Sequence, residues 1–186
     1  MKAWMKWLLA LALLLLIGLF WRGLQSNPRH IPSVLLGHPA AGFTAAALDD
    51  GREIKLDQYR GKVLLLNFWA SWCTECAAEH ATLLKLARDY QSNPDFAMLG
   101  VVYQDQPEDA RAFLQKKGSA FPSVIDAKGQ IGIDYGVYGV PETFLIDRQG
   151  KIICKQFGPI TGAEETKVRK RWLDTLLAGK ELKSCE

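Results

Sequence analysis

Residues 61–76 read GKVLLLNFWASWCTEC, and this stretch decides the fold. It opens with a short apolar run, residues 62–69, of the kind expected for a central strand buried on both faces of a sheet. The stretch ends on Cys73 and Cys76, which two residues separate. A helix is predicted to follow over residues 73–90, because apolar side chains recur there at helical spacing. The cysteine pair is therefore expected where a buried strand meets the start of a helix.

Strand and helix patterns alternate through the rest of the chain. The predicted elements are a hairpin over residues 43–56, a strand over 96–103, a helix over 107–117, a short strand over 121–125, a hairpin formed by 143–147 and 151–157, and a helix over 163–177. This order predicts an α/β domain with a mixed central sheet and helices on both of its faces.

The amino-terminal segment is apolar throughout residues 7–21, and a snorkelling Lys6 extends the apolar stretch outward to Ala3. A membrane-spanning helix needs roughly 17–25 residues, so this segment is long enough. It lacks the small residues that end a cleaved signal peptide. We therefore predict an uncleaved anchor over residues 1–23, and the few flanking basic residues place the main domain outside the cytoplasm.

The segment after the predicted anchor contains Pro28 and Pro32, which break regular structure. We predict a linker over residues 24–36 and one domain of ordinary size over residues 37–186. The formal net charge of the chain is only +3. Because no phosphate-binding loop, nucleic-acid motif or internal repeat is present in the sequence, no nucleic-acid partner is expected.

The spacing of Cys73 and Cys76 predicts redox chemistry. At a helix N-terminus, free N–H groups and the helix dipole stabilise a thiolate. Cys73 is thus the expected attacking thiol, Cys76 the resolving thiol, and the two form the expected redox-active disulfide. A zinc site would need a second ligand pair, and a c-type haem site would need His where Ala77 stands. A copper-type pairing with His80 stays open as an alternative, but no metal and no cofactor is predicted.

Two stretches carry a resemblance to a known family. Residues 61–73, followed by Cys76, Glu79 and His80, are similar to the membrane-tethered thioredoxin-like redoxins. Residues 135–147, YGVYGVPETFLID, narrow the likeness to the DsbE/CcmG thiol–disulfide interchange proteins of bacterial cytochrome c maturation. The likeness covers nearly the whole chain. It implies a thioredoxin fold with an N-terminal hairpin extension and an N-terminal transmembrane helix.

The resemblance also implies a cellular role. Proteins of this family are held in the bacterial inner membrane by a single span, with the catalytic domain in the periplasm. They act as reductants of apocytochrome c cysteines, so the implied partners are apocytochrome c or its maturation chaperones. A membrane thiol reductase of the DsbD or CcdA kind is the implied electron donor.

The resemblance also implies which residues of this chain form the site. The resemblance implies a cis proline at Pro141 opposite the cysteine pair, and an acidic groove that restricts the choice of partner. The implied catalytic residues are Cys73, Cys76, Pro141, Glu79 and Glu142. The implied residues of the substrate groove are Trp72, Thr74, Glu75, Tyr138, Val140 and Asp105.

The sequence departs from the family pattern at a few positions. Asn67 stands where thioredoxin has a buried aspartate, and an amide cannot act as a base. Our hypothesis is that Glu79 or Glu142 deprotonates Cys76, directly or through water. Cys154 and Cys185 are additional, and the sequence leaves open whether they form a disulfide or stay free.

Other functions remain open at the level of sequence. They are a general periplasmic disulfide reductase, a metal or haem chaperone that binds through the cysteine pair, and a non-enzymatic assembly scaffold. A peroxidase would need a lone cysteine with a nearby Thr/Arg activator, and that signature is absent from the sequence.

Overall fold

The computed structural model describes residues 3–24, 35–182 and 185, without the side chain of Leu24. The chain divides into two compact units, Met1–Pro32 and Ser33–Glu186. Each unit is described by itself. Most of the predicted linker, residues 25–34, lies outside the described residues.

The first unit holds one helix, α1 (Ala3–Leu24). Residues Ala3–Gly23 have a mean hydropathy of 2.2, and none of this window is buried. Twenty-one helical residues extend about 31 Å at 1.5 Å each, close to the thickness of the hydrocarbon core of a bilayer. By length and composition, α1 is therefore able to cross a membrane.

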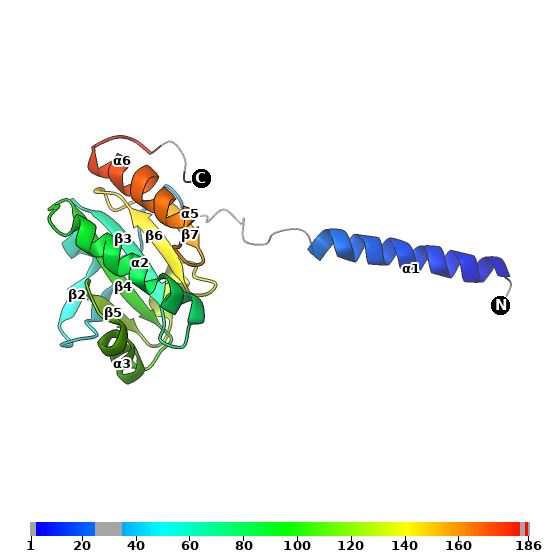
Figure 1. The fold of residues 1–186 in the computed structure, drawn as a ribbon, viewed down its shortest axis with the longest axis horizontal. Coiled ribbons are helices and arrows are strands. Elements are labelled where there is room, and N and C mark those ends of the chain that lie inside the picture. Colours follow the sequence, from blue (N-terminus) through cyan, green and yellow to red (C-terminus); the bar gives the residue numbers. More distant parts are fainter. Residues whose placement is uncertain (1–2, 25–34, 183–184, 186) are drawn as a thin grey trace. The chain divides into compact units, whose positions relative to one another are not determined.

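The second unit is built on a five-stranded sheet of order β5-β4-β3-β6-β7 (Figure 1). Its strands are β3 (Val63–Trp69), β4 (Phe96–Tyr103), β5 (Ser123–Asp126), β6 (Glu142–Ile146) and β7 (Ile152–Phe157). The β3–β4 and β4–β5 pairs are parallel, whereas β3–β6 and β6–β7 are antiparallel. Every residue of β3 is buried, which confirms the predicted central strand and the mixed sheet.

Two strands, β1 (Thr44–Ala46) and β2 (Glu53–Lys55), form the predicted N-terminal hairpin, although each is short. A bridge from Ala47 to Val124 attaches this hairpin to β5. A 3₁₀ turn at Leu56–Tyr59 and the helix α4 (Gln130–Asp134) were not predicted. Both are too short to show a periodic apolar pattern.

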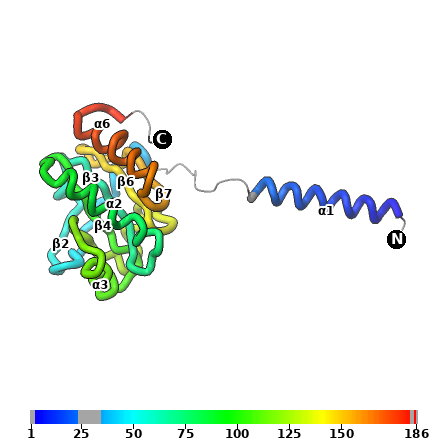
Figure 2. Tube along the Cα trace, in the orientation of Figure 1, coloured from blue at the N-terminus to red at the C-terminus, as the bar shows by residue number. Residues whose placement is uncertain are grey.

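The helices α2 (Thr74–Tyr90) and α3 (Pro107–Lys117) lie where the sequence predicted them. The predicted C-terminal helix over residues 163–177 consists of α5 (Ala163–Thr166), a π-helical segment (Lys167–Leu173) and α6 (Asp174–Leu177). This C-terminal helical stretch runs beside α2 (Figure 1, Figure 2), and ion pairs join Lys85 to Glu165 and Asp89 to Arg169. The two pack on one face of the sheet, and α4 packs on the other.

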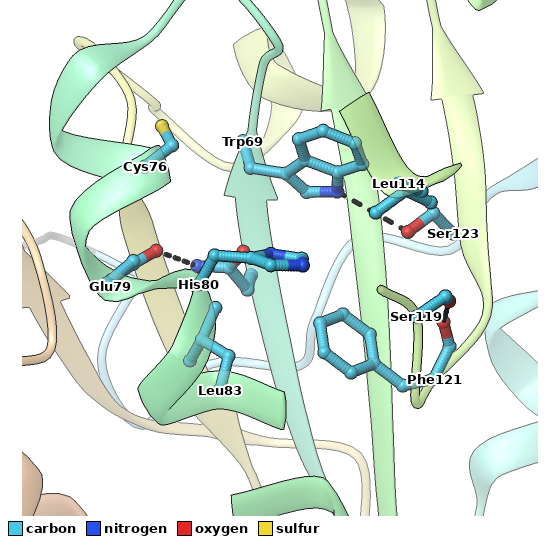
Figure 3. A pocket seen from close by; sticks show the side chains of 10 residues that line it. Trp69, Cys76, Glu79, His80, Leu83, Leu114, Ser119, Phe121 and Ser123 are labelled. Atoms are coloured by element: carbon cyan, nitrogen blue, oxygen red, sulfur yellow. Dashed lines mark hydrogen bonds between the residues drawn. The ribbon is translucent and has the colours of Figure 1, made fainter. Parts of the chain in front are cut away.

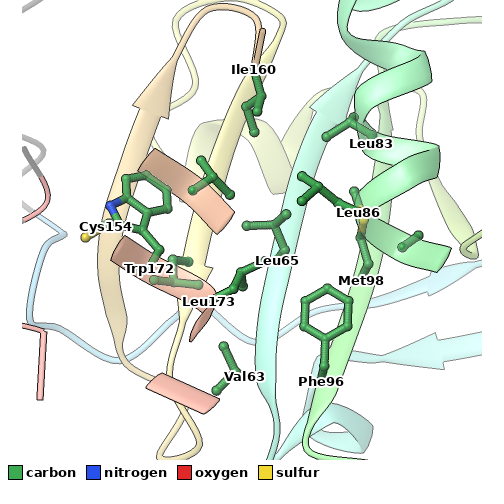
Figure 4. Packing of buried hydrophobic residues seen from close by; sticks show 13 residues of the cluster. Val63, Leu65, Leu83, Leu86, Phe96, Met98, Cys154, Ile160, Trp172 and Leu173 are labelled. Carbon is green, nitrogen blue, oxygen red and sulfur yellow. The ribbon is translucent and has the colours of Figure 1, made fainter. Parts of the chain in front are cut away.

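The core beneath α2 fixes the position of the cysteine pair. Leu65 of β3 packs with Leu86 of α2 and with Trp172 of the C-terminal stretch (Figure 4). The opposite face buries Phe68, Tyr135 and Phe144 as an aromatic cluster. Because both faces of β3 are covered, the end of this strand is a rigid base for the site that follows it.

The structure resolves the question of the additional cysteines. Cys154 and Cys185 form a disulfide, and Cys154 is completely buried in the core on β7. The indole N–H of Trp172 donates to the carbonyl of Cys185 at 3.3 Å. The end of the chain is thus attached covalently to the sheet beside the C-terminal helical stretch.

Replacing Cys154 and Cys185 together by alanine is expected to lower the free energy of unfolding by about 2–4 kcal/mol, because the bond closes a long loop in the unfolded chain. The separation of the two cysteines is 31 residues. Urea unfolding of the full chain in detergent, followed by tryptophan fluorescence, measures the change. Adding a reductant also opens the Cys73–Cys76 bond in both proteins, so it should remove the difference in stability between the original protein and the double variant. Equal stability of the two proteins would show that the bond has no stabilising role.

Candidate active site

The cysteine pair occupies the junction of β3 and α2. Cys73 and Cys76 are joined by a disulfide with their Cα atoms 5.2 Å apart. Cys73 is the N-cap of α2, and its Sγ accepts the backbone N–H of Cys76 at 3.0 Å. This contact satisfies an N–H that the first helical turn leaves free, and it stabilises negative charge on that sulfur. The sulfur of Cys73 is therefore the one that the helix stabilises as a thiolate.

Pro141 stands directly before β6, and the Val140–Pro141 peptide bond is cis, as the family resemblance implied. The carbonyl oxygen of Val140 lies 3.4 Å from Sγ of Cys73. The carbonyl of Pro141 accepts the N–H of Gly158 at 3.0 Å, which ties this loop to the end of β7. The fold thus brings the cis proline, some 70 residues downstream in sequence, against the N-terminal sulfur.

Large exposed side chains flank these groups. Trp72 is 59% exposed and Tyr138 80% exposed. Within the described part of the second unit, Ile133 is the one other large apolar side chain that is exposed. Thr74 and Glu75 are also exposed at the start of α2. These residues, with the half-buried Val140, border the side from which a partner can reach Cys73.

Asp105 differs from the expected groove residue because it is buried. One of its carboxylate oxygens accepts the N–H of Ser71 at 2.6 Å, and the other accepts the N–H of Gln106 at 2.8 Å. The carboxylate therefore fastens the loop before Cys73 to the segment that starts α3. The structure gives Asp105 a part in shaping the site and not in lining the groove.

Glu142 is also buried, and both of its carboxylate oxygens are engaged. Oε1 accepts the N–H of Tyr138 at 3.1 Å. Oε2 forms an ion pair with Nζ of Lys155 at 2.7 Å. The angles at this contact do not meet those of a hydrogen bond. Lys155 in turn donates to the carbonyl of Gly136 at 2.8 Å. This buried pair fastens the loop that leads to Pro141, which leaves Glu142 poorly placed to act as the base for Cys76.

Sequence reasoning missed Lys155. The available signal was a charged lysine inside the predicted strand IICKQF, because a charge in a strand so near the core requires a partner. The cation lies 4.5 Å from the centre of the Phe157 ring and 4.9 Å from that of Phe144. Burial lowers the pKa of Lys155, and the nearby Glu142 opposes that shift.

Replacing Lys155 by methionine is expected to destabilise the protein by about 3–5 kcal/mol, because the carboxylate of Glu142 is then buried without its cation. Thermal unfolding at neutral pH measures the loss. In the double variant Lys155→Met/Glu142→Gln, most of the stability should return, since no unpaired charge remains. A double variant as unstable as the single one would mean that the lysine acts through packing alone.

Glu79 is completely buried one helical turn beyond Cys76. Its Oε1 accepts the amide N–H of Asn67 at 2.9 Å, and its Oε2 accepts the N–H of Ile160 at 2.7 Å. Burial raises the pKa of Glu79 to about 7, although both hydrogen bonds act in the opposite direction. Glu79 and Cys76 line the same small cavity (Figure 3). A carboxyl group with this pKa can exchange a proton with a neighbouring thiol near neutral pH.

His80 follows Glu79 on the helix and serves the structure. Its Nε2 donates to the carbonyl of Gly118 at 2.9 Å, and its ring packs edge-on against Phe113. Burial lowers the pKa of His80, so the ring is neutral at pH 7. In the described ranges, no three His, Cys, Asp or Glu residues come together as a metal site.

Disulfide exchange needs a sulfur that can attack as a thiolate, a second sulfur within bonding distance, and a backbone edge that aligns the partner. Cys73, Cys76 and the Val140–Pro141 peptide provide these on a mixed sheet flanked by helices. Fold and site together define a thioredoxin-like thiol–disulfide oxidoreductase.

Known proteins narrow this class. Residues 36–155 match the AhpC/TSA family. The thiol:disulfide interchange protein DsbE of Allochromatium vinosum is 41% identical over 149 residues, which cover 79% of this chain and 80% of the relative. HelX of Rhodobacter capsulatus, also a thiol:disulfide interchange protein, is 36% identical over 94% of this chain and 97% of its own length. The chain belongs to the AhpC/TSA family and is a thiol:disulfide interchange protein of the DsbE/HelX type.

Solved structures agree with this assignment. A Chlorobium tepidum protein described as a thiol:disulfide interchange protein DsbE superimposes with a TM-score of 0.66 and 31% identity, covering 71% of this chain and 91% of that protein. A Bacteroides thetaiotaomicron protein described as a protein disulfide isomerase gives a TM-score of 0.69 and 30% identity, covering 77% and 90%. The thioredoxin fold inferred from the sequence is thereby confirmed.

Proposed function

We propose that this protein is a periplasmic reductant of apocytochrome c cysteines, anchored in the bacterial inner membrane. In this proposal, residues 1–23 form the anchor, residues 24–36 a linker and residues 37–186 the catalytic domain. The observation that carries the proposal is the buried Glu79 behind Cys76. Negative charge close to the pair disfavours a stabilised thiolate, and this favours a dithiol that gives up its electrons.

The reaction proceeds in two exchange steps. The Cys73 thiolate attacks a partner disulfide, and a mixed disulfide forms while one partner thiolate leaves. Glu79 then takes the proton of the Cys76 thiol, and the Cys76 thiolate attacks Sγ of Cys73. The second partner sulfur leaves as a thiolate, the Cys73–Cys76 disulfide remains, and two electrons have passed to the partner.

The groove is suited to an extended polypeptide. The carbonyl of Val140 beside Cys73 is available to a partner's backbone N–H once the partner sulfur is in place. Trp72 and Tyr138 offer exposed aromatic surface. A membrane thiol reductase of the DsbD or CcdA kind would return the electrons by the same two steps in reverse.

A comparison of the reduction rates of two peptides tests the choice of partner. The reduced full chain in detergent is mixed with a disulfide-bonded Cys-x-x-Cys-His peptide, and the second-order rate of reduction is measured. The matched control is the same peptide with its residues other than the cysteines shuffled. We expect the first peptide to react at least about tenfold faster, since discrimination of this size needs little more than one good contact. Equal rates would instead identify a general disulfide reductase.

A further inference from the structure

A row of polar residues crosses the sheet underneath Glu79. Asn67 of β3 pairs with Thr143 of β6 on one side and with Gly100 of β4 on the other. Gly100 pairs in turn with Ser123 of β5. Directly paired residues point to the same face of a sheet, and for this row it is the face covered by α2. The side chains of Asn67 and Ser123 are thus separated by a position that has no side chain.

The missing side chain at Gly100 lets Ser123 and Trp69 approach the sheet closely. A Cβ atom at this position would lie 2.4 Å from Oγ of Ser123 and 2.8 Å from Nε1 of Trp69. A small cavity beside these side chains is lined by Asn67, Cys76, Glu79 and Ser123, among others (Figure 3). The cavity has a volume of about 10 Å³, which is about the space that one water molecule needs.

Asn67 has one polar atom that the protein does not satisfy. Its amide nitrogen donates to Glu79 and, at 2.9 Å, to Oγ1 of Thr143. Its Oδ1 is buried and has no hydrogen-bond partner among the described residues. A buried carbonyl oxygen of this kind is costly to leave unpaired. On the other side of the cavity, Oγ of Ser123 accepts the indole N–H of Trp69 at 3.4 Å, so its own hydroxyl can donate.

We propose that a single water molecule binds in this cavity, accepts the hydroxyl hydrogen of Ser123 and donates to Oδ1 of Asn67. By fixing the Asn67 amide with its nitrogen toward Glu79, this water keeps Glu79 able to ionise. A flipped amide would turn its oxygen toward the carboxylate and oppose ionisation. Ser123 is therefore a positioning residue for the resolving step. The inference deepens the proposed function, because it rests on Glu79 acting as the base for Cys76.

A surface pocket lies next to the inner cavity. It has a volume of about 350 Å³ and lies against α3 and the start of β5. Leu114, Ser119, Phe121 and Ser123 line both this pocket and the inner cavity, so these side chains stand between the proposed water and the surface.

Other groups also act on the pKa of Glu79. Glu75, one turn earlier on α2, raises the pKa of Glu79, whereas the N–H of Ile160 lowers it. His80 lines the same cavity but is neutral at pH 7, since burial lowers its pKa, the hydrogen bond to Gly118 opposes this only in part, and the charge of Lys117 lowers the pKa further. A change at Ser123 therefore acts on Glu79 through Asn67 and the water, and not through another charge.

The functional test follows the release of a coloured thiolate from an aromatic disulfide by the reduced full chain. The first release reports the attack by Cys73, and the second reports the attack by Cys76. Ser123→Ala should leave the first release unchanged and slow the second about two- to fivefold at pH 7, because a rise of half to one unit in the pKa of Glu79, from about 7, lowers its ionised fraction by that factor. The matched control, Ser119→Ala, removes a hydroxyl that donates to the carbonyl of Phe121, and it should behave like the original protein.

Two outcomes would overturn the inference. One is an identical pH profile for the second release in Ser123→Ala, Ser119→Ala and the original protein. The other is a crystal structure of the full chain, detailed enough to show ordered waters, that has no water within hydrogen-bonding distance of Oδ1 of Asn67. Glu79→Gln distinguishes failure of this inference from failure of the proposed mechanism. If Glu79 is not the base for Cys76, Glu79→Gln leaves the second release unchanged, whatever the crystal structure shows at Asn67.

Discussion

Replacing Cys73 by serine is expected to abolish disulfide reduction, with a loss of at least about 10³-fold, because no thiolate then remains to open the partner disulfide. Cys76 cannot take over, since it lies within α2, whereas Cys73 is the N-cap of the helix and its sulfur accepts the N–H of Cys76. The measurement is the rate at which the reduced chain reduces a disulfide-bonded peptide.

Cys76→Ser is the matched control, and its expected result is different. Cys73 still attacks, but nothing resolves the mixed disulfide, so a covalent complex with the peptide should accumulate on non-reducing gels. The trapped complex should disappear in the double variant. Equal trapping by Cys73→Ser and Cys76→Ser would contradict the assignment of attacking and resolving thiols.

Replacing Glu79 by glutamine is expected to slow the second exchange step by about 10²-fold at pH 8, because proton transfer by a positioned group contributes at least that much. In the original protein the rate of this step should rise as pH increases through about 7, where Glu79 ionises, and then level off. The variant should lose this rise. Glu75→Gln, an exposed change on the same helix, is the control and should keep the rise at a somewhat lower pH, because Glu75 raises the pKa of Glu79. The same rise in both variants would assign the proton transfer to another group.

The pKa of Glu79 also predicts how stability depends on pH. Its ordinary value is 4.5, and burial raises it to about 7 in the folded state. The folded protein therefore binds the proton more tightly, and this contribution to stability is fully present below pH 4.5 and is lost as pH rises to 7. The loss amounts to up to about 3 kcal/mol. Urea unfolding from pH 4.5 to 8 should show this decline in the original protein and a weaker one in Glu79→Gln.

Local patterns allowed much of the fold to be predicted. The apolar run of β3, the helical spacing of α2 and the proline at the start of α3 each carry a strong signal within a few residues. The short helix α4 and the π-helical turn at Lys167–Leu173 do not. Tertiary packing, not local preference, fixes such short or irregular segments.

The site was predicted only as far as its residues are close in sequence or share a known motif. Cys73, Cys76 and Pro141 come together as expected. The roles of Asp105 and Glu142 depend on partners far along the chain, namely Ser71 and Lys155. No pattern in one sequence shows which distant backbone N–H or ammonium group will satisfy a buried carboxylate. The same holds for Asn67, whose environment is created by register across the sheet.

The reduction potential of the Cys73–Cys76 pair tests the central claim most directly. The full chain in detergent is equilibrated with glutathione buffers, thiols are trapped by alkylation, and the cysteine peptides are quantified separately so that the Cys154–Cys185 bond does not interfere. A reductant should have a potential nearer to thioredoxin, roughly −270 mV, than to the strong oxidant DsbA, roughly −120 mV. A value near that of DsbA would reverse the direction of electron flow and contradict the account.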